Sequence, residues 1–149
     1  KTCYLILNSR VEAEDAVQET FIRVFKSIHN FNEESSLYTW IYTIALNICR
    51  DMLKRRKYAS SFEEYMLDQG ESAEEIVLER INREILKERL SSLPFIYKEV
   101  LVLFYFEGLT VKEISHILRE KEGTIKSKLS RGRKILKNAL VKGGDLFEG

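Results

Sequence analysis

The chain has 149 residues, of which 44% are hydrophobic and 32% charged, and its formal net charge at pH 7 is +1. This length fits one domain or two small ones, and the composition supports a buried core in a soluble helical protein. The longest apolar run, Val100 to Phe106, is too short to span a bilayer, which excludes a transmembrane protein. Net charge alone does not indicate a nucleic-acid partner, so any such surface must come from segregated charge.

The two cysteines, Cys3 and Cys49, are too few for a disulfide framework, and neither has a histidine at metal-ligand spacing. The sequence shows no signal peptide. We therefore expect a protein of the reducing cytoplasm with no metal and no cofactor. Because the sequence starts at Lys1 without a methionine, we also expect a short N-terminal piece to precede it.

The first elements in chain order are helical. Tyr4 to Leu7 has the pattern of the end of an apolar helix, and Ser9 with Glu12 forms an S-x-x-E capping box that predicts the start of the next one. Acidic and amide side chains lie near its start. Helical spacing places five apolar side chains on one face of this helix: Val17, Phe21, Val24, Phe25 and Ile28.

A polar stretch, His29 to Ser36, predicts a loop, and Leu37 to Lys57 predicts a long helix. Its C-terminal cluster, Lys54 to Lys57, carries more cations than the helix dipole requires. The candidate core residues of this helix are Trp40, Ile41, Ile44, Ile48 and Met52.

The segment from Tyr58 to Glu71 has no clean periodicity and predicts a linker. Between Tyr58 and Glu79 there is no lysine or arginine, but there are several glutamates and an aspartate. Basic clusters lie on both sides of this acidic stretch. The order basic, acidic, basic suggests two DNA-facing modules with a connector between them.

The second module is also helical. Ser72 and Glu75 form a capping box for a helix that ends near Ser91, and Pro94 suits the first turn of a helix that runs to Gly108. No stretch of useful length alternates like a strand. The sequence therefore predicts an all-α protein: two small helical domains joined by a flexible acidic linker.

The stretch from Glu107 to Leu136 predicts a helix-turn-helix. Thr110 and Glu113 form a capping box for a short helix, and the apolar pattern restarts after Arg119. The second helix turns Ile125, Leu129, Ile135 and Leu136 inward and leaves its many cations on the other faces. A helical hairpin with a solvated basic face is the alternative, but the capping box, short turn and one-sided cations together favour DNA binding.

Together these residues resemble the bacterial extracytoplasmic-function (ECF) sigma factors. The family's polymerase-binding helix is similar to residues 12–26, EAEDAVQETFIRVFK. Its promoter-melting helix, which reads the −10 element, is similar to residues 38–57, YTWIYTIALNICRDMLKRRK. LPFIYKEVLVLFYFEGLTVKEIS and GTIKSKLSRGRKILK resemble its −35-reading domain. The resemblance implies region 2 at residues 1–57, a linker at 58–71 and region 4, the helix-turn-helix domain, at 72–149.

The resemblance also implies roles for individual residues. Those expected to bind core polymerase are Asp15, Gln18, Glu19 and Phe21, although the spacing of Phe21 equally suits the core. Those expected at the −10 element, where a flipped base needs polar edges and a ring, are Asn32, Ser35, Ser36, Tyr38, Thr39, Asn47, Arg50, Lys54, Arg55 and Arg56. Those expected at the −35 element are Thr124, Lys126, Ser127, Lys128, Arg131, Arg133 and Lys134.

One departure from the family pattern concerns the turn of the helix-turn-helix, where glycine is usual and this chain has Arg119, Glu120 and Lys121. A left-handed backbone at Arg119 would cost roughly 1 kcal/mol relative to glycine. The first helix of the chain is also shorter than in the family.

The resemblance implies three partners: bacterial RNA polymerase core, promoter DNA and an anti-sigma factor, which would inhibit the chain and could hold it at the membrane. The main alternative is a dimeric helix-turn-helix regulator, which leaves Asp15 to Glu19 and the 38–57 helix without a role. An enzyme is disfavoured because His29 and His116 are far apart and no phosphate-binding glycine loop is present. A pure interaction scaffold is a third reading.

Overall fold

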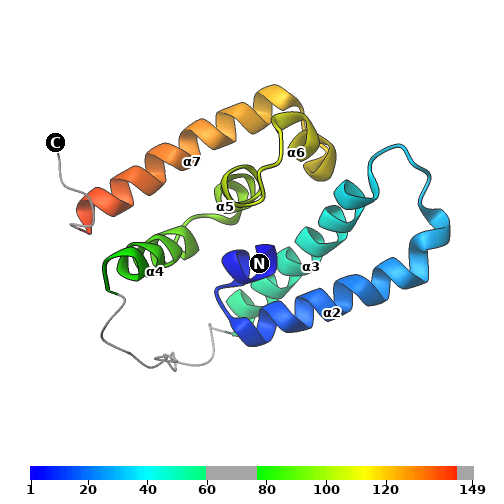
Figure 1. Cartoon of the computed structure of the whole chain (residues 1–149), viewed down its shortest axis with the longest axis horizontal. Coiled ribbons are helices and arrows are strands. Elements are labelled where there is room, and N and C mark those ends of the chain that lie inside the picture. Colours follow the sequence, from blue (N-terminus) through cyan, green and yellow to red (C-terminus); the bar gives the residue numbers. More distant parts are fainter. Residues whose placement is uncertain (60–76, 144–149) are drawn as a thin grey trace.

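The structure, a computed structural model, describes residues 1–59 and 77–143. Every regular element in this part of the chain is helical, which confirms the predicted all-α class (Figure 1). The elements are α1 (Thr2–Leu7), α2 (Arg10–Ser27), η1 (Ile28–Asn30), α3 (Leu37–Ala59), α4 (Val77–Ser91), α5 (Phe95–Leu101), η2 (Val102–Phe106), α6 (Val111–Leu118) and α7 (Glu122–Lys142). The predicted Ser72–Glu75 capping box and most of the predicted linker lie outside the described residues.

In the N-terminal half, α2 and α3 lie side by side as a helical hairpin, and α1 packs against both (Figure 1). The Ser9 side chain accepts a hydrogen bond from the backbone N–H of Glu12, so the predicted start of α2 is confirmed. The buried residues of α2 are Ala13, Ala16 and Thr20. Their small side chains allow α1 and α3 to approach the helix closely.

The predicted apolar face of α2 is therefore not its core face. Phe21 is 58% exposed and Phe25 is 84% exposed, and Val17 and Ile28 also reach solvent. Periodicity correctly grouped these side chains, but the smaller side chains on the adjacent face fill the space against α1 and α3. The apolar stripe is left without cover within the described residues.

In the C-terminal half, α5 begins at Phe95 after Pro94 and continues directly into the π-helical segment η2, which ends at Phe106, shortly before Gly108. The core of this half comes from Val100 to Leu103 and from inward residues of α6 and α7. Gly132 lets α7 approach α5, because a Cβ at this position would lie 3.2 Å from the Leu101 side chain. The predicted inward position of Ile135 is wrong, since this residue is 37% exposed near the end of the packed region.

The helix-turn-helix forms as predicted. Thr110 and Glu113 make both hydrogen bonds of the capping box, and Ile114 and Ile117 are buried on the inner face of α6. Arg119 ends the helix in the left-handed region with φ 54° and ψ 44°, where its N–H donates to the carbonyl of Ser115. The turn therefore has the geometry that glycine adopts most easily.

Replacing Arg119 with glycine is expected to stabilise the protein by up to about 1 kcal/mol. Glycine removes the Cβ clash of the left-handed backbone, and the larger entropy of the unfolded chain offsets part of this gain. The matched control is Lys112→Gly at an exposed position in the first turn of α6, which should destabilise by up to about 1 kcal/mol. Urea unfolding of the three proteins would compare them, and a destabilised R119G would contradict the strain argument.

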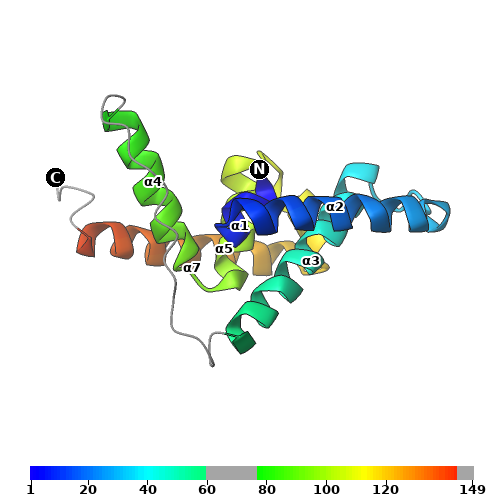
Figure 2. The ribbon, with the colours of Figure 1, turned by 90° about the horizontal axis from the view of Figure 1, so that it is seen from below.

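The two halves pack against each other, with α1 between the α2–α3 hairpin and helices α4 and α5 in both views (Figure 1, Figure 2). The Nζ of Lys98 donates to the carbonyl of Ile6 at 3.0 Å. The hydroxyl of Tyr42 donates to a carboxylate oxygen of Glu107 at 2.9 Å, and that of Thr43 to the carbonyl of Ile117 at 3.3 Å. Polar contacts from α1 and α3 thus fix the helix-turn-helix half beside the first half.

Among the described residues, none of the helices combines the length and apolarity needed to cross a membrane. The same part of the chain contains no cluster of three or more histidine, cysteine or acidic side chains that could hold a metal ion.

Candidate nucleic-acid and protein interfaces

The exposed face of α2 carries several large apolar side chains. Val17, Gln18, Phe21, Ile22, Phe25 and Lys26 line a shallow groove along it. Contiguous exposed apolar surface of this kind is typical of a protein interaction site. We call these six residues the α2 groove.

The residues predicted to bind polymerase lie on or beside the α2 groove. Asp15 and Gln18 are exposed, and Phe21 projects from the groove rather than into the core. Glu19 is half-buried and its Oε1 accepts from Nε of Arg23 at 2.9 Å. The structure thus places polar groups around an apolar centre, which is the usual anatomy of a protein interface.

The loop before α3 brings several predicted −10 residues together. The backbone N–H of Thr39 donates to Oγ of Ser36 at 3.1 Å, and the Ser36 hydroxyl donates to Oγ1 of Thr39 at 2.9 Å. Thr39 is only 8% exposed. These two residues start the helix, so Thr39 positions the loop instead of presenting an open polar edge.

Other side chains of this region are accessible. Tyr38 is 68% exposed, Asn32 is exposed, and Ser35 is half-buried. Trp40 is half-buried with its ring centroid 5.3 Å from that of Phe31, so it packs under the loop, which agrees with its predicted structural role.

The cations at the end of α3 divide into two groups. Lys54 and Arg55 are exposed. Arg56 is half-buried, donates to the carbonyl of Leu7 at 2.8 Å and forms an ion pair with Glu12. Arg56 therefore joins the end of α3 to the junction of α1 and α2, which is a structural role.

Arg50 joins the two halves of the molecule. Its Nη2 lies 3.2 Å from Oε2 of Glu99, and its guanidinium lies over the ring of Phe95 at 5.2 Å from the centroid. The Glu99 side chain is 2% exposed. Burial raises the pKa of the Glu99 carboxyl to about 7, and the Arg50 charge acts in the opposite direction. Arg50 also donates to the exposed Asn47 at 3.2 Å.

The second helix of the helix-turn-helix, α7, has the predicted one-sided charge. Its buried residues are Ile125, Leu129 and Gly132. The predicted −35 residues that are exposed are Thr124, Lys126, Ser127, Arg131, Arg133 and Lys134. Lys128 differs, because its Nζ lies 2.6 Å from Glu120 and its side chain is only 17% exposed. Arg133 donates to the hydroxyl of Tyr105 at 3.0 Å.

Sequence reasoning missed three glutamates of the C-terminal half that have specific partners: Glu99, Glu107 and Glu120. Glu99 binds Arg50, Glu107 binds Tyr42 and Glu120 binds Lys128. Burial and the Glu107 carboxylate raise the pKa of Tyr42 to about 12. A signal for Glu99 was present, since it is the only acidic residue of the largely apolar FIYKEVLVLF segment at 95–104.

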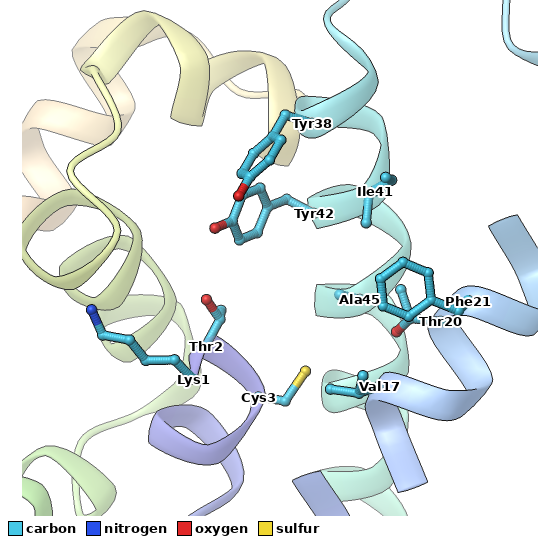
Figure 3. Close-up of a pocket in the computed structure, with 10 residues that line it drawn as sticks. All are labelled: Lys1, Thr2, Cys3, Val17, Thr20, Phe21, Tyr38, Ile41, Tyr42 and Ala45. Atoms are coloured by element: carbon cyan, nitrogen blue, oxygen red, sulfur yellow. The ribbon is translucent and has the colours of Figure 1, made fainter. Parts of the chain in front are cut away.

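A cavity of about 300 Å³ lies where α1, α2 and α3 meet (Figure 3). Apolar side chains from α2 and α3, among them Val17, Ile41 and Ala45, form most of its walls. Thr2 and Cys3 of α1 border the cavity, and the Cys3 sulfur points into it (Figure 3).

Comparison with known proteins gives two matches in the order of the two halves. Residues 1–58 match the family model of sigma-70 region 2, and residues 83–136 match that of sigma-70 region 4. The ECF RNA polymerase sigma factor SigW of Bacillus subtilis is 31% identical over 155 residues, covering 93% of this chain and 80% of SigW.

Solved structures show the same likeness. The chain is similar to the sigma factor RpoE of Bartonella quintana, solved in complex with the anti-sigma factor NepR, with a TM-score of 0.71 and 25% identity over 93% of this chain and 87% of that one. It shares the fold of CnrH, solved in complex with the cytosolic domain of CnrY, with a TM-score of 0.69 and 19% identity over 95% of this chain and 78% of that one.

Proposed function

The chain belongs to the ECF RNA polymerase sigma factors of the sigma-70 family, and we propose that it directs core polymerase to specific promoters. Residues 1–57 act as region 2, which binds polymerase and melts the −10 element, and residues 72–149 act as region 4, which reads the −35 element. Residues 58–71 connect them. The chain is a non-catalytic initiation factor, and phosphodiester synthesis belongs to the polymerase.

One observation carries this proposal: an exposed apolar docking face and an exposed cationic recognition helix occur in the same chain. The α2 groove needs a protein partner to cover it, and the outer face of α7 suits DNA. A dimeric regulator would use the second surface and leave the first unexplained. A sigma factor uses both at once.

At the −10 element we assign base contacts to the accessible groups around the start of α3. Tyr38 supplies an exposed ring for stacking, and Asn32 and Ser35 supply polar edges. Ser36 and Thr39 fix the loop through their mutual hydrogen bond. Asn47, Lys54 and Arg55 lie along the exposed face of the same helix and follow the strand backbone.

At the −35 element, the exposed start of α7 enters the major groove. Thr124, Lys126, Ser127 and Arg131 lie near the base edges, where arginine or lysine to guanine is the commonest specific contact. Arg133 and Lys134 lie further along the helix and contact phosphates, which position the domain without reading sequence.

We also assign an anti-sigma factor as regulator. RpoE and CnrH, which this chain resembles in fold, were each solved with a partner protein, and for RpoE that partner is the anti-sigma factor NepR. An anti-sigma factor attached to the membrane would hold an otherwise cytoplasmic chain at the membrane surface.

Transcription with purified core polymerase and a pool of promoters tests the proposal. We expect the chain to give specific initiation, and we expect the triple variant D15A/Q18A/E19A to lose at least about 90% of it, because polar contacts around the α2 groove disappear. Glu88→Ala, an exposed acidic residue of α4, is the control and should retain full activity. Unchanged initiation by the triple variant would reject this polymerase contact. A wild-type chain that does not initiate, but binds duplex operators as a dimer, would reject the function.

A further inference from the structure

We propose that Cys3 and Cys49 form a peroxide-reactive pair that closes to an intramolecular disulfide between α1 and α3. This modification site does not depend on the proposed function. It rests on the proximity of the two thiols and on the cavity that opens onto one of them.

The fold brings the two cysteines together although they are far apart in the sequence. Cys3 lies on α1 and Cys49 on α3, and these helices pack against each other. Both thiols are reduced and buried, with Cys3 5% exposed and Cys49 0% exposed. Cys3 and Ala45 line the same cavity, and Cys49 lies one helical turn beyond Ala45 on the same face of α3. Both cysteines belong to one buried cluster of the core. Two neighbouring thiols on packed helices can form an S–S bond with little movement of the helices.

A small oxidant can reach one of the two sulfurs. Cys3 borders the 300 Å³ cavity and also lines a second surface pocket with Tyr4, Ala13 and Val17. Figure 3 shows its sulfur pointing into the cavity. Hydrogen peroxide is little larger than water and fits such a space. Cys49 does not line either pocket and is fully enclosed.

The environments of the two thiols are also chemically unequal. The neighbouring Cys49 thiol lowers the pKa of Cys3 to about 7. The Cys3 thiol and burial raise the pKa of Cys49. Since the thiolate is the nucleophile, the accessible Cys3 is the attacking residue and the enclosed Cys49 is the resolving residue.

The reaction then has two balanced steps. The Cys3 thiolate attacks one oxygen of hydrogen peroxide, the O–O bond breaks, and the departing hydroxide takes a proton to become water, leaving a sulfenic acid on Cys3. The sulfur of Cys49 attacks the sulfenic sulfur, the S–S bond forms and the S–O bond breaks. The displaced hydroxide leaves as water with the proton of Cys49. Two thiols are oxidised by two electrons, and one peroxide is reduced to two waters.

The bond has a measurable consequence for the fold. It would fasten α1, which lies between the two halves, to the central helix α3. A cross-link between positions so distant in sequence restricts the unfolded chain more than the folded one. Oxidised protein is therefore expected to melt at a higher temperature, by roughly 5–10 °C, and reduction should reverse the shift.

The test treats the full chain in native buffer with hydrogen peroxide, followed by acid quenching, intact mass and non-reducing peptide mapping. We expect the monomer to lose two hydrogens and to yield a peptide linking Cys3 with Cys49. The matched variants separate the roles. C49A should accumulate a sulfenic acid on Cys3 that dimedone traps, and C3A should react about tenfold or more slowly. Neither variant should show the melting shift.

Several outcomes would overturn the proposal. These are two intact thiols after peroxide treatment, disulfides only between separate chains, equal reaction rates for C3A and C49A, or a melting temperature lowered by oxidation. Circular dichroism of each variant verifies that it is folded. If an alanine variant fails to fold, the peptide map and melting curve of the wild-type chain still decide the question.

Discussion

Replacing Phe21 and Phe25 together with alanine is expected to weaken binding of the chain to RNA polymerase core by about 100-fold or more. The two rings are 58% and 84% exposed along the α2 groove, so a partner must bury most of their surface. Aromatic residues at the centre of an interface commonly contribute 2 kcal/mol or more, and each 1.4 kcal/mol is about tenfold in affinity. Fluorescence anisotropy of labelled protein titrated with core polymerase would measure the loss.

Val11→Ala provides the matched control. Val11 is 70% exposed on the same helix, but it does not line the α2 groove. Its replacement should leave affinity within about twofold of the wild type. Because both phenylalanines are largely solvated, the double variant should unfold at nearly the same urea concentration as the wild type. Equal binding by the double variant and the control would show that polymerase docks elsewhere.

Helix α2 also shows what periodicity can and cannot predict. Sequence spacing grouped Val17, Phe21 and Phe25 on one face and could not say whether this face met the core or a partner. The structure places the small residues Ala13 and Ala16 against the rest of the protein instead. An apolar stripe on a helix indicates only that its side chains are buried either in the protein core or against a partner. Which of the two applies depends on segments outside the helix.

Local signals predicted the helix-turn-helix more completely. The Thr110–Glu113 capping box, the left-handed Arg119 and the buried Ile125 and Leu129 all follow from rules that act within one or two turns of helix. These rules need no knowledge of the tertiary arrangement. The same rules do not reveal that Lys128 is paired with Glu120, because that contact depends on how the turn is folded.

Contacts between distant segments were beyond sequence reasoning. Arg50 and Glu99 are separated by 49 positions, and Arg56 and Glu12 by 44. Composition predicted two basic modules but not that Arg50 would be paired across them. As a result, Arg50 and Arg56, which the family resemblance assigned to the −10 element, have protein partners in this structure, while the neighbouring Arg55 remains exposed.

The Arg50–Glu99 pair leads to a prediction about pH. The pKa of the Glu99 carboxyl is near its usual 4.5 in the unfolded chain and about 7 in the folded protein. Because the pKa is higher in the folded state, folded protein holds this proton more tightly than the unfolded chain does. The proton on Glu99 therefore stabilises the fold fully below about pH 4.5, and this stabilisation is lost as the pH rises through about 7. The group contributes at most about 3 kcal/mol across this window.

Removing Arg50 is expected to sharpen this dependence. Without the guanidinium, the buried carboxylate keeps only the charge of Lys128 nearby and loses its ion-pair partner at pH 8, so R50A should lose about 2 kcal/mol of unfolding free energy. Full loss of a partner from a buried pair costs more, but the Arg50 side chain is 39% exposed and water screens it. At pH 5 the carboxyl is protonated, and R50A should lose much less.

A double-mutant cycle with urea unfolding at pH 5 and pH 8 measures this coupling. E99Q keeps the shape of the side chain but cannot ionise, so its stability should change little across the window, and R50A/E99Q should lose much less at pH 8 than R50A alone. The control is Arg55→Ala, which removes an exposed cation of the same helix and should leave the free energy of unfolding unchanged at both pH 5 and pH 8. A loss in R50A that is equal at pH 5 and pH 8 would contradict the titration of Glu99, and its cause would then lie in the lost packing of Arg50 on Phe95.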